Sequence, residues 1–130
     1  MGLDITIVRG RVHPSHLADM QMGKTIGSGL KYDGEDIVQV TDDVYYQRRM
    51  FKVRDALVKA LNNGSESEYH LLTPSRVTEI IAGTTHEAER LSKLPGDVYF
   101  DEVQPLLDLA SCMREIQCDE SDELYFAIWG

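Results

Sequence analysis

Apolar and polar residues alternate over residues 3–8, and an unbroken apolar and aromatic run occupies residues 124–129. Alternation is typical of a strand with one buried face, whereas a short continuous run is typical of a strand that is buried on both faces. We therefore expect the first and the last of these segments to be strands of one sheet.

A second strand is predicted over residues 36–40, which follow an Asp33–Gly34 turn dipeptide and are rich in β-branched side chains. Thr41 or Asp42 then has the side chain needed to cap a helix. The inward stripe of this helix would be Tyr46, Met50, Val53, Leu57 and Leu61. Gly64 would end it, because glycine adopts the left-handed conformation at low cost.

The second half of the chain predicts three more helices. Thr73 is typical of an N-cap before Pro74, and Gly83 is expected to end the helix that they begin. Thr84 and Glu87 have capping-box spacing, so a separate helix is predicted to start there and run to about residue 94. The last helix is expected over about residues 101–117. Residues 65–69 are expected to form a polar loop, and residues 10–34 a loop with one short helix over residues 15–22.

Length and composition indicate one compact α+β domain over residues 1–130, in which a small antiparallel sheet that includes both terminal strands packs against three or four helices. No stretch is long and apolar enough to span a bilayer, and no secretion signal is apparent, so we expect a cytoplasmic protein that makes no membrane contact. Cys112 and Cys118 lack a metal or redox spacing, and no cofactor is predicted. A homodimer is compatible with these features.

The formal charge is −9, and residues 101–130 hold eight acidic residues against one base, Arg114. Such a surface repels phosphates, which argues against direct nucleic-acid binding and favours a basic partner. The candidate partner-binding acids are Asp119, Glu120, Asp122 and Glu123. Two other interpretations stay open: the acids keep a small protein soluble, or they mimic the charge of DNA.

A second candidate site comprises Tyr46, Arg48 and Arg49, in a segment with four bases and three aromatic residues. A guanidinium beside tyrosines is suited to binding a carboxylate or phosphate, which predicts a small-ligand or nucleotide site and allows an enzymatic one. The alternative is that these arginines pair with the acidic C-terminal segment and hold two helices together.

His13, His16 and Asp19 recur at intervals of three residues, as ligands on one helical face would. Pro14 disfavours a regular helix through His13, so no metal site is predicted. The histidines also have no Ser or Cys partner that the sequence identifies, and no catalytic residues are predicted.

The chain resembles a group of small bacteriophage and prophage proteins. The motifs that carry the resemblance are Met-Gly-Leu-Asp at residues 1–4, Tyr-Gln-Arg-Arg at 46–49, Tyr-His-Leu-Leu-Thr at 69–73, Leu-Pro-Gly at 94–96 and the aromatic strand at 125–129. The resemblance implies a compact α+β domain of phage origin and no known catalytic residues. It leads us to expect a non-enzymatic accessory protein that binds and modulates, most simply by inhibition, a host protein such as a defence component in the host cytoplasm.

Overall fold

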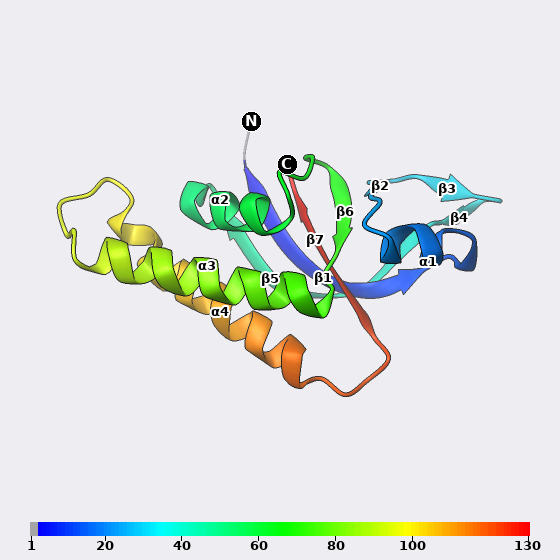
Figure 1. Ribbon diagram of the computed structural model, residues 1–130. Helices are drawn as coiled ribbons and strands as arrows, with labels where there is room; N and C mark the ends of the chain where they lie inside the picture. The colour runs from blue at the N-terminus through cyan, green and yellow to red at the C-terminus, as the bar shows by residue number, and fades with distance from the viewer. Residues whose placement is uncertain (1–2) are drawn as a thin grey trace.

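A computed structural model describes residues 3–130 as an α+β domain with an antiparallel five-stranded sheet and four α-helices (Figure 1). The main sheet has the strand order β2-β6-β7-β1-β5. Its strands are β1 (Asp4–Val12), β2 (Ile26–Gly27), β5 (Val38–Arg48), β6 (Glu68–Leu71) and β7 (Leu124–Trp129). A separate two-stranded ribbon is formed by β3 (Lys31–Tyr32) and β4 (Glu35–Asp36). The helices are α1 (Pro14–Gln21), α2 (Phe51–Ala60), α3 (Pro74–Ser92) and α4 (Val103–Cys118), with a short 3-10 turn, η1 (Phe100–Glu102), before α4.

The two terminal strands belong to one sheet, as predicted, and the structure places them next to each other. Antiparallel pairing joins β1 to β7 from Ile5 opposite Trp129 to Gly10 opposite Leu124. Because β7 lies between β6 and β1, it has no free edge and both of its faces are covered, which explains its continuous apolar sequence. Met1 and Gly2, which open the first motif of the phage resemblance, lie outside the described residues.

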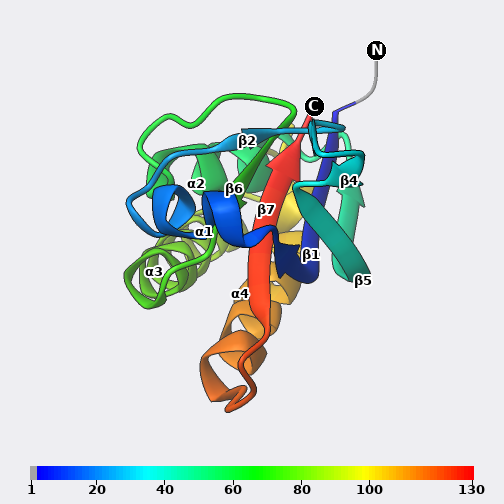
Figure 2. The same ribbon diagram turned by 90° about the vertical axis from the view of Figure 1, so that its right-hand side faces the viewer.

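Two layers of side chains fill the interior on opposite faces of the sheet. On one face, Ile5, Ile7 and Trp129 pack against the apolar sides of α2, α3 and α4. On the other face, Val8 and Phe126 pack against Met20 of α1 and its neighbours. Figures 1 and 2 show α3 and α4 running side by side beneath the sheet, with α1 at the far end of the molecule. The sheet therefore separates a large helical layer from a smaller one.

The helix predicted from Thr41 or Asp42 to Leu61 is wrong in its first half. Residues Val38–Arg48 form β5, an edge strand paired with β1, and α2 begins only at Phe51. Arg49 separates the two elements with a left-handed φ of 59°, which interrupts any continuous helix. The apparent stripe from Tyr46 to Leu61 therefore combines a strand with a helix.

The helix break predicted at Gly83 is also wrong, because α3 runs unbroken from Pro74 to Ser92. Thr73 caps its start as predicted, and its hydroxyl accepts a hydrogen bond from the Arg76 N–H. Thr84 is no cap: its buried hydroxyl donates to the Ile80 carbonyl within the same helix. Buried residues recur at helical spacing on both sides of Gly83, so packing against α4 outweighs the local stop signal.

Two loops expected from the sequence contain strands. Residues Glu68–Leu71 form β6, which pairs with β7. Between residues 10 and 34, β1 continues to Val12 and the short strands β2 and β3 accompany the expected short helix. After α2 the left-handed residues are Asn62 and Asn63, whereas Gly64 is needed for space: a Cβ there would lie 2.4 Å from Cε1 of His70.

Candidate functional site

The structure brings Tyr46 and Arg48 together with Asp4 on the surface of β1 and β5. Register places Arg48 opposite Asp4 and Tyr46 opposite Thr6. The Tyr46 hydroxyl donates to Asp4 Oδ1 at 2.8 Å, and Arg48 Nε lies 4.0 Å from the same oxygen. The hydrogen bond to Asp4 raises the pKa of Tyr46. Asp4 is thus the acidic partner of Arg48, in place of the C-terminal acids proposed from the sequence.

Arg49 does not join this cluster through an ion pair among residues 3–130. Its backbone N–H donates to the Leu3 carbonyl, which fixes the turn from β5 into α2, and its side chain is exposed. A hollow of about 250 Å³ beside Asp4 is lined by Thr6, Ser28 and Ile128 among others, and neither arginine lines it. The arrangement of arginines around a cavity, which the ligand-site hypothesis predicted, is not formed here.

The four candidate acids lie in the turn between α4 and β7, which projects from the bottom of the molecule in Figure 1. Asp119 is the C-cap of α4; its carboxylate accepts hydrogen bonds from the Ser121 N–H at 2.9 Å and from the Tyr125 hydroxyl. These hydrogen bonds, that of Tyr125 first, hold the pKa of Asp119 below its usual value. Asp119 is therefore ionised at neutral pH.

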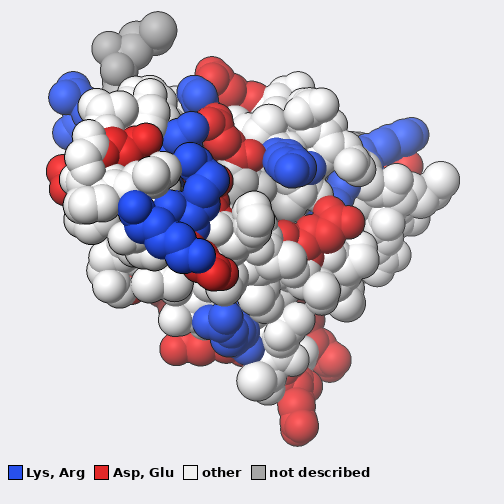
Figure 3. All heavy atoms as spheres, turned by 60° about the vertical axis from the view of Figure 1, so that its left-hand side comes forward, with Lys and Arg blue, Asp and Glu red and all other residues white. Residues whose placement is uncertain are grey.

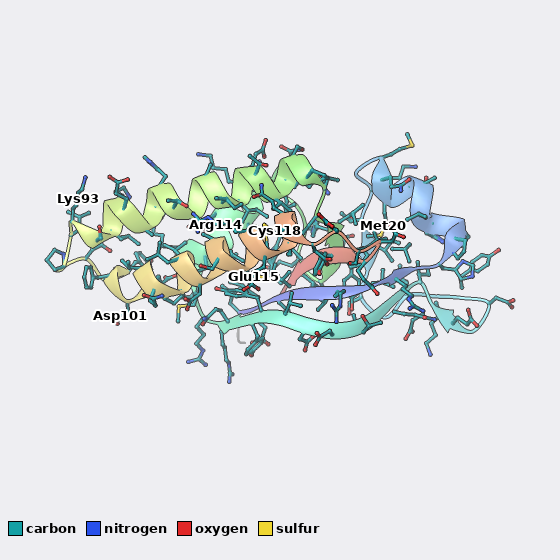
Figure 4. The ribbon with its side chains drawn as sticks, turned by 90° about the horizontal axis from the view of Figure 1, so that it is seen from below. Met20, Lys93, Asp101, Arg114, Glu115 and Cys118 are labelled. Atoms are coloured by element: carbon teal, nitrogen blue, oxygen red, sulfur yellow. The ribbon has the colours of Figure 1, made fainter. Side chains whose placement is uncertain are left out.

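Next to this turn is a pocket of about 340 Å³ that we call the acidic pocket. It lies where α3 begins, α4 ends and β7 begins. Its apolar lining, which we call the floor, includes Leu72, Val77, Ile116, Leu124 and Tyr125, and Asp119 and Glu123 also line the pocket. Thr78 and Gln117 join the two helices across it, because Gln117 Nε2 donates to Thr78 Oγ1 at 3.2 Å. Figure 4 shows Cys118 at this end of the α3–α4 layer, with Lys93 and Asp101 at the other end.

The four acids are divided by their surroundings. Asp119 lines the acidic pocket alone of the two hollows, Asp122 lines the second hollow with Arg11 and Leu17, and Glu123 lines both. Glu120 lines neither of these two hollows. The sequence indicated the acidic turn but gave no sign of which of its acids meet an apolar floor, because that floor comes from segments more than 40 residues earlier in the chain as well as from α4 and β7.

The two candidate sites do not meet. Tyr46 lies beside Thr6, and the acidic turn enters β7 at Leu124 beside Gly10, four residues further along β1. Four residues of a strand span about 13 Å. The acidic pocket also involves Leu72 and Val77 of the helical layer, whereas Asp4 and Thr6 belong to the opposite face from Ile5 and Ile7. The two groups are therefore independent sites.

Buried titratable groups elsewhere hold the fold together. Glu102, which is 5% exposed, accepts hydrogen bonds from the N–H groups of Lys52 at 2.8 Å and Val53 at 3.2 Å. It thereby caps α2, whose own N-cap residue, Met50, makes no side-chain hydrogen bond. Burial raises the pKa of Glu102 against the opposing effect of these hydrogen bonds. Sequence reasoning missed this cap, because its two ends lie about 50 residues apart.

His70 is the second such group. Its ring is 1% exposed, stacks on Trp129 at 4.7 Å between centroids, and has Nε2 at 2.9 Å from the Ser65 carbonyl. That contact assigns the proton to Nε2, which donates to the carbonyl. Burial lowers the pKa of His70. One ring face is thus held by Trp129 of β7 and one nitrogen by the loop before β6.

A larger groove of about 590 Å³ lies between α2 and α3, over Ala56, Ala60 and Gly83. Figure 3 shows basic side chains gathered on one side of the molecule, interspersed with acidic ones. On α2 and α3, Arg54 pairs with Asp55 and Arg90 with Glu87, and Lys93, just after α3, pairs with Glu89. Acidic and basic side chains therefore largely neutralise one another on these helices, whereas the lining of the acidic pocket, among residues 3–130, contains two acids and no base.

The histidines of α1 are held by a serine. Ser15 Oγ lies 2.6 Å from Nδ1 of His13 and 2.7 Å from Nδ1 of His16, while Asp19 pairs with Lys24 at 3.6 Å. Within residues 3–130, no group of three or more His, Cys, Asp or Glu side chains is arranged to hold a metal ion. In the same part of the chain, every helix is too short or too polar to cross a membrane.

Comparison of the chain with models of protein families, with curated proteins and with solved structures gave no match. The geometry of the acidic pocket is therefore the basis for its interpretation.

Proposed function

We propose that this protein is a binding domain that takes a basic segment of a partner protein into the acidic pocket. One observation carries the proposal: a single pocket of about 340 Å³ is lined both by apolar side chains and by Asp119 and Glu123. Apolar surface anchors a partner by burial, and carboxylates beside it favour a segment of positive charge.

A protein segment fits this pocket better than a nucleic acid does. The floor offers apolar contact, and the pocket lies in the most acidic part of the chain, where phosphates are repelled. A basic residue beside an apolar one would satisfy both parts of the pocket. The binding energy would come from the few side chains that enter it, as it does in most protein interfaces.

The resemblance to bacteriophage proteins directs the search for the partner to a bacterial host. We propose that the chain acts without catalysis in the host cytoplasm, by occupying a basic segment of a host protein such as a defence component and inhibiting it. This proposal unites the acidic turn, which the sequence indicated, with the pocket that the fold builds next to it.

Affinity capture from bacterial lysate tests the proposal with variants of two adjacent residues of α3, of which the control, at Glu79, makes the larger change in net charge. Thr78→Arg places a cation in the acidic pocket, whereas Glu79→Arg, on the next residue, faces the groove between α2 and α3. Both positions are exposed, so both variants should fold. We expect a specific host protein to be retained by the wild type and by Glu79→Arg and to be lost with Thr78→Arg. Equal retention by all three proteins would refute the proposal.

A second candidate function rests on the convergence of Tyr46 and Arg48 on Asp4 beside the 250 Å³ hollow. This cluster would suit a small anionic ligand only if Arg48 leaves Asp4. Asp4→Asn removes the competing charge and should then increase binding of inorganic phosphate, measured by calorimetry. Unchanged binding in this variant would eliminate the small-ligand function.

A further inference from the structure

We propose that the acidic pocket recognises an arginine side chain of the partner segment, with its guanidinium at Asp119 and Glu123 and its methylene groups on the apolar floor. The inference rests on the proposed function, because it names the chemistry of the segment that the pocket takes. Three features support it: the ionised carboxylates, the negative end of α4 next to them, and the apolar side chains of the floor.

The charge at the pocket is fixed and negative. Tyr125 and Ser121 donate hydrogen bonds to Asp119, and both donors are neutral, so they keep the carboxylate ionised without cancelling its charge. Glu123 adds a second carboxylate to the same pocket. A side chain with several N–H donors in one plane is suited to two neighbouring carboxylates, and the guanidinium has five.

The end of α4 strengthens the preference for a cation. The last carbonyls of a helix carry partial negative charge, and lysine or arginine is normally favourable there. The last turn of α4 contains no basic residue, and Asp119 caps it. The pocket is lined by Ile116 and Gln117 of that turn, so a bound cation would lie close to the negative end of the helix.

The neighbouring strand β1 contains two arginines, and Arg11 lines the second hollow, of which Glu123 is also part. Arg9 of β1 lies opposite Tyr125 of β7, and its charge contributes to the lowered pKa of Asp119. Its guanidinium Nη2, however, pairs with Asp42 of β5 at 3.2 Å, and Arg9 does not line the pocket. Within residues 3–130, Arg9 and Arg11 thus lie near the two carboxylates, but neither lines the acidic pocket.

The floor selects arginine over a small cation. Arginine buries its methylene stem along apolar surface while its charged group stays at the rim, which matches a floor of Leu72, Val77 and Ile116 beside two carboxylates. Tyr125 adds an aromatic ring to the lining, and a planar guanidinium stacks on such a ring better than an ammonium does. We therefore expect arginine to bind more tightly than lysine.

The test is a titration of the isotopically labelled full-length chain, followed by amide chemical shifts. The probes are the capped tripeptides Leu-Arg-Leu, Leu-Lys-Leu and Leu-citrulline-Leu; citrulline keeps the shape of arginine and lacks its charge. We expect Leu-Arg-Leu to shift residues 72–78 and 116–125, and to bind about tenfold more tightly than the citrulline peptide, with lysine in between.

Matched variants locate the carboxylates. Asp119→Asn/Glu123→Gln should abolish the difference between arginine and citrulline, whereas Glu120→Gln/Asp122→Asn, with the same change in net charge, should preserve it. The inference is overturned if citrulline or lysine binds as well as arginine, if the shifts map to another surface, or if no tripeptide binds. Because the three peptides are compared on the wild type, this result does not depend on the folding of a variant.

The two proposals fail in different ways. If the arginine preference is absent but capture of the partner is still lost with Thr78→Arg, the proposal of arginine recognition is refuted and the proposed binding function stands. Capture that is insensitive to Thr78→Arg removes the binding function itself.

Discussion

Two carboxylates at opposite ends of helices have opposite roles in this protein. Glu102 is buried and accepts two backbone N–H groups at the start of α2, the positive end of that helix. Asp119 is at the end of α4, the negative end, and accepts its hydrogen bonds from the neighbouring turn and from Tyr125. Glu102 is buried and serves only to stabilise the fold, whereas Asp119 keeps its charge in the lining of an open pocket.

The origin of the hydrogen-bond donors distinguishes a carboxylate that stabilises the fold from one that is available to a partner. At Glu102 the donors come from another element, so the carboxylate joins the segment before α4 to α2. At Asp119 the turn donor, Ser121, is only two residues away, and the pocket remains open beside it. Loss of Glu102 should therefore affect stability, and loss of Asp119 should affect binding.

The largest expected effect is that of Glu102→Ala. It removes the cap from two buried N–H groups of α2, which should lower the free energy of unfolding by about 2 kcal/mol. Glu102→Gln retains an acceptor oxygen and should cost less. Urea denaturation of both variants measures the difference. A loss for Glu102→Ala no greater than that of an exposed substitution would show that this cap contributes little.

The pH dependence of these carboxylates should differ in sign. The pKa of Glu102 is raised in the fold, so its contribution to stability is present at acid pH and is lost as the pH rises from about 4 through the raised value. The pKa of Asp119 is lowered, so its contribution is present above pH 4 and is lost as the pH falls through the lowered value. Unfolding free energies of the wild type minus Glu102→Gln, and of the wild type minus Asp119→Asn, should change in opposite directions between pH 3 and 7.

The stability of His70 variants tests whether burial of a titratable side chain makes the stability of the fold depend on pH. Its pKa is lowered, so its contribution to stability is present above about pH 6.5 and is lost as the pH falls. His70→Phe keeps a ring against Trp129 but loses the hydrogen bond to Ser65, which should cost about 1 kcal/mol at pH 7.5. The cost should shrink toward pH 5. A cost that is constant with pH would show that folding does not lower the pKa of His70.

The start of α2 offers a smaller test. Arg49 lies just before α2, the helix whose start is capped by Glu102, and it adopts a left-handed conformation. Arg49→Gly relieves this strain and should stabilise the fold by up to about 1 kcal/mol. Because Arg49 is exposed and distant from the acidic pocket, peptide binding should not change. Destabilisation measured by thermal unfolding would mean that the arginine side chain has a structural role.

The smallest effect on stability is expected for Asp119→Asn. The asparagine oxygen can still accept a hydrogen bond from the Ser121 N–H, and its amide N–H can donate to the Tyr125 hydroxyl oxygen, so the urea midpoint at pH 7 should fall far less than in Glu102→Ala. A comparable fall would mean that Asp119 is mainly a structural residue, and the contrast between the two carboxylates would be lost.

The sequence predicted the fold class and both terminal strands, because the alternation in residues 3–8 and the apolar run in residues 124–129 each lie within one element. It failed at Tyr46, where apolar residues of β5 and α2 happen to have helical spacing across the turn at Arg49. It also failed at Gly83, where a local stop signal is outweighed by packing of α3 along α4. In both places, contacts with distant segments decide the local structure.

The candidate site was predictable only in part. Asp119 and Glu123 belong to a cluster of acids that is evident in the sequence, but the floor at Leu72 and Val77 comes from a distant segment. Arg48 was associated with a ligand or with the C-terminal acids, and its observed partner is Asp4, which the pairing of β1 with β5 places opposite it. Pairing between distant strands and helices is the information that the sequence pattern lacks.

The most direct test of the central claim is the affinity of the Leu-Arg-Leu peptide for the wild type and for Asp119→Asn/Glu123→Gln, measured by chemical-shift titration. The account predicts that the double variant stays folded and binds the peptide about tenfold more weakly, with the wild-type shifts centred on residues 72–78 and 116–125. Equal affinity for the two proteins would contradict it.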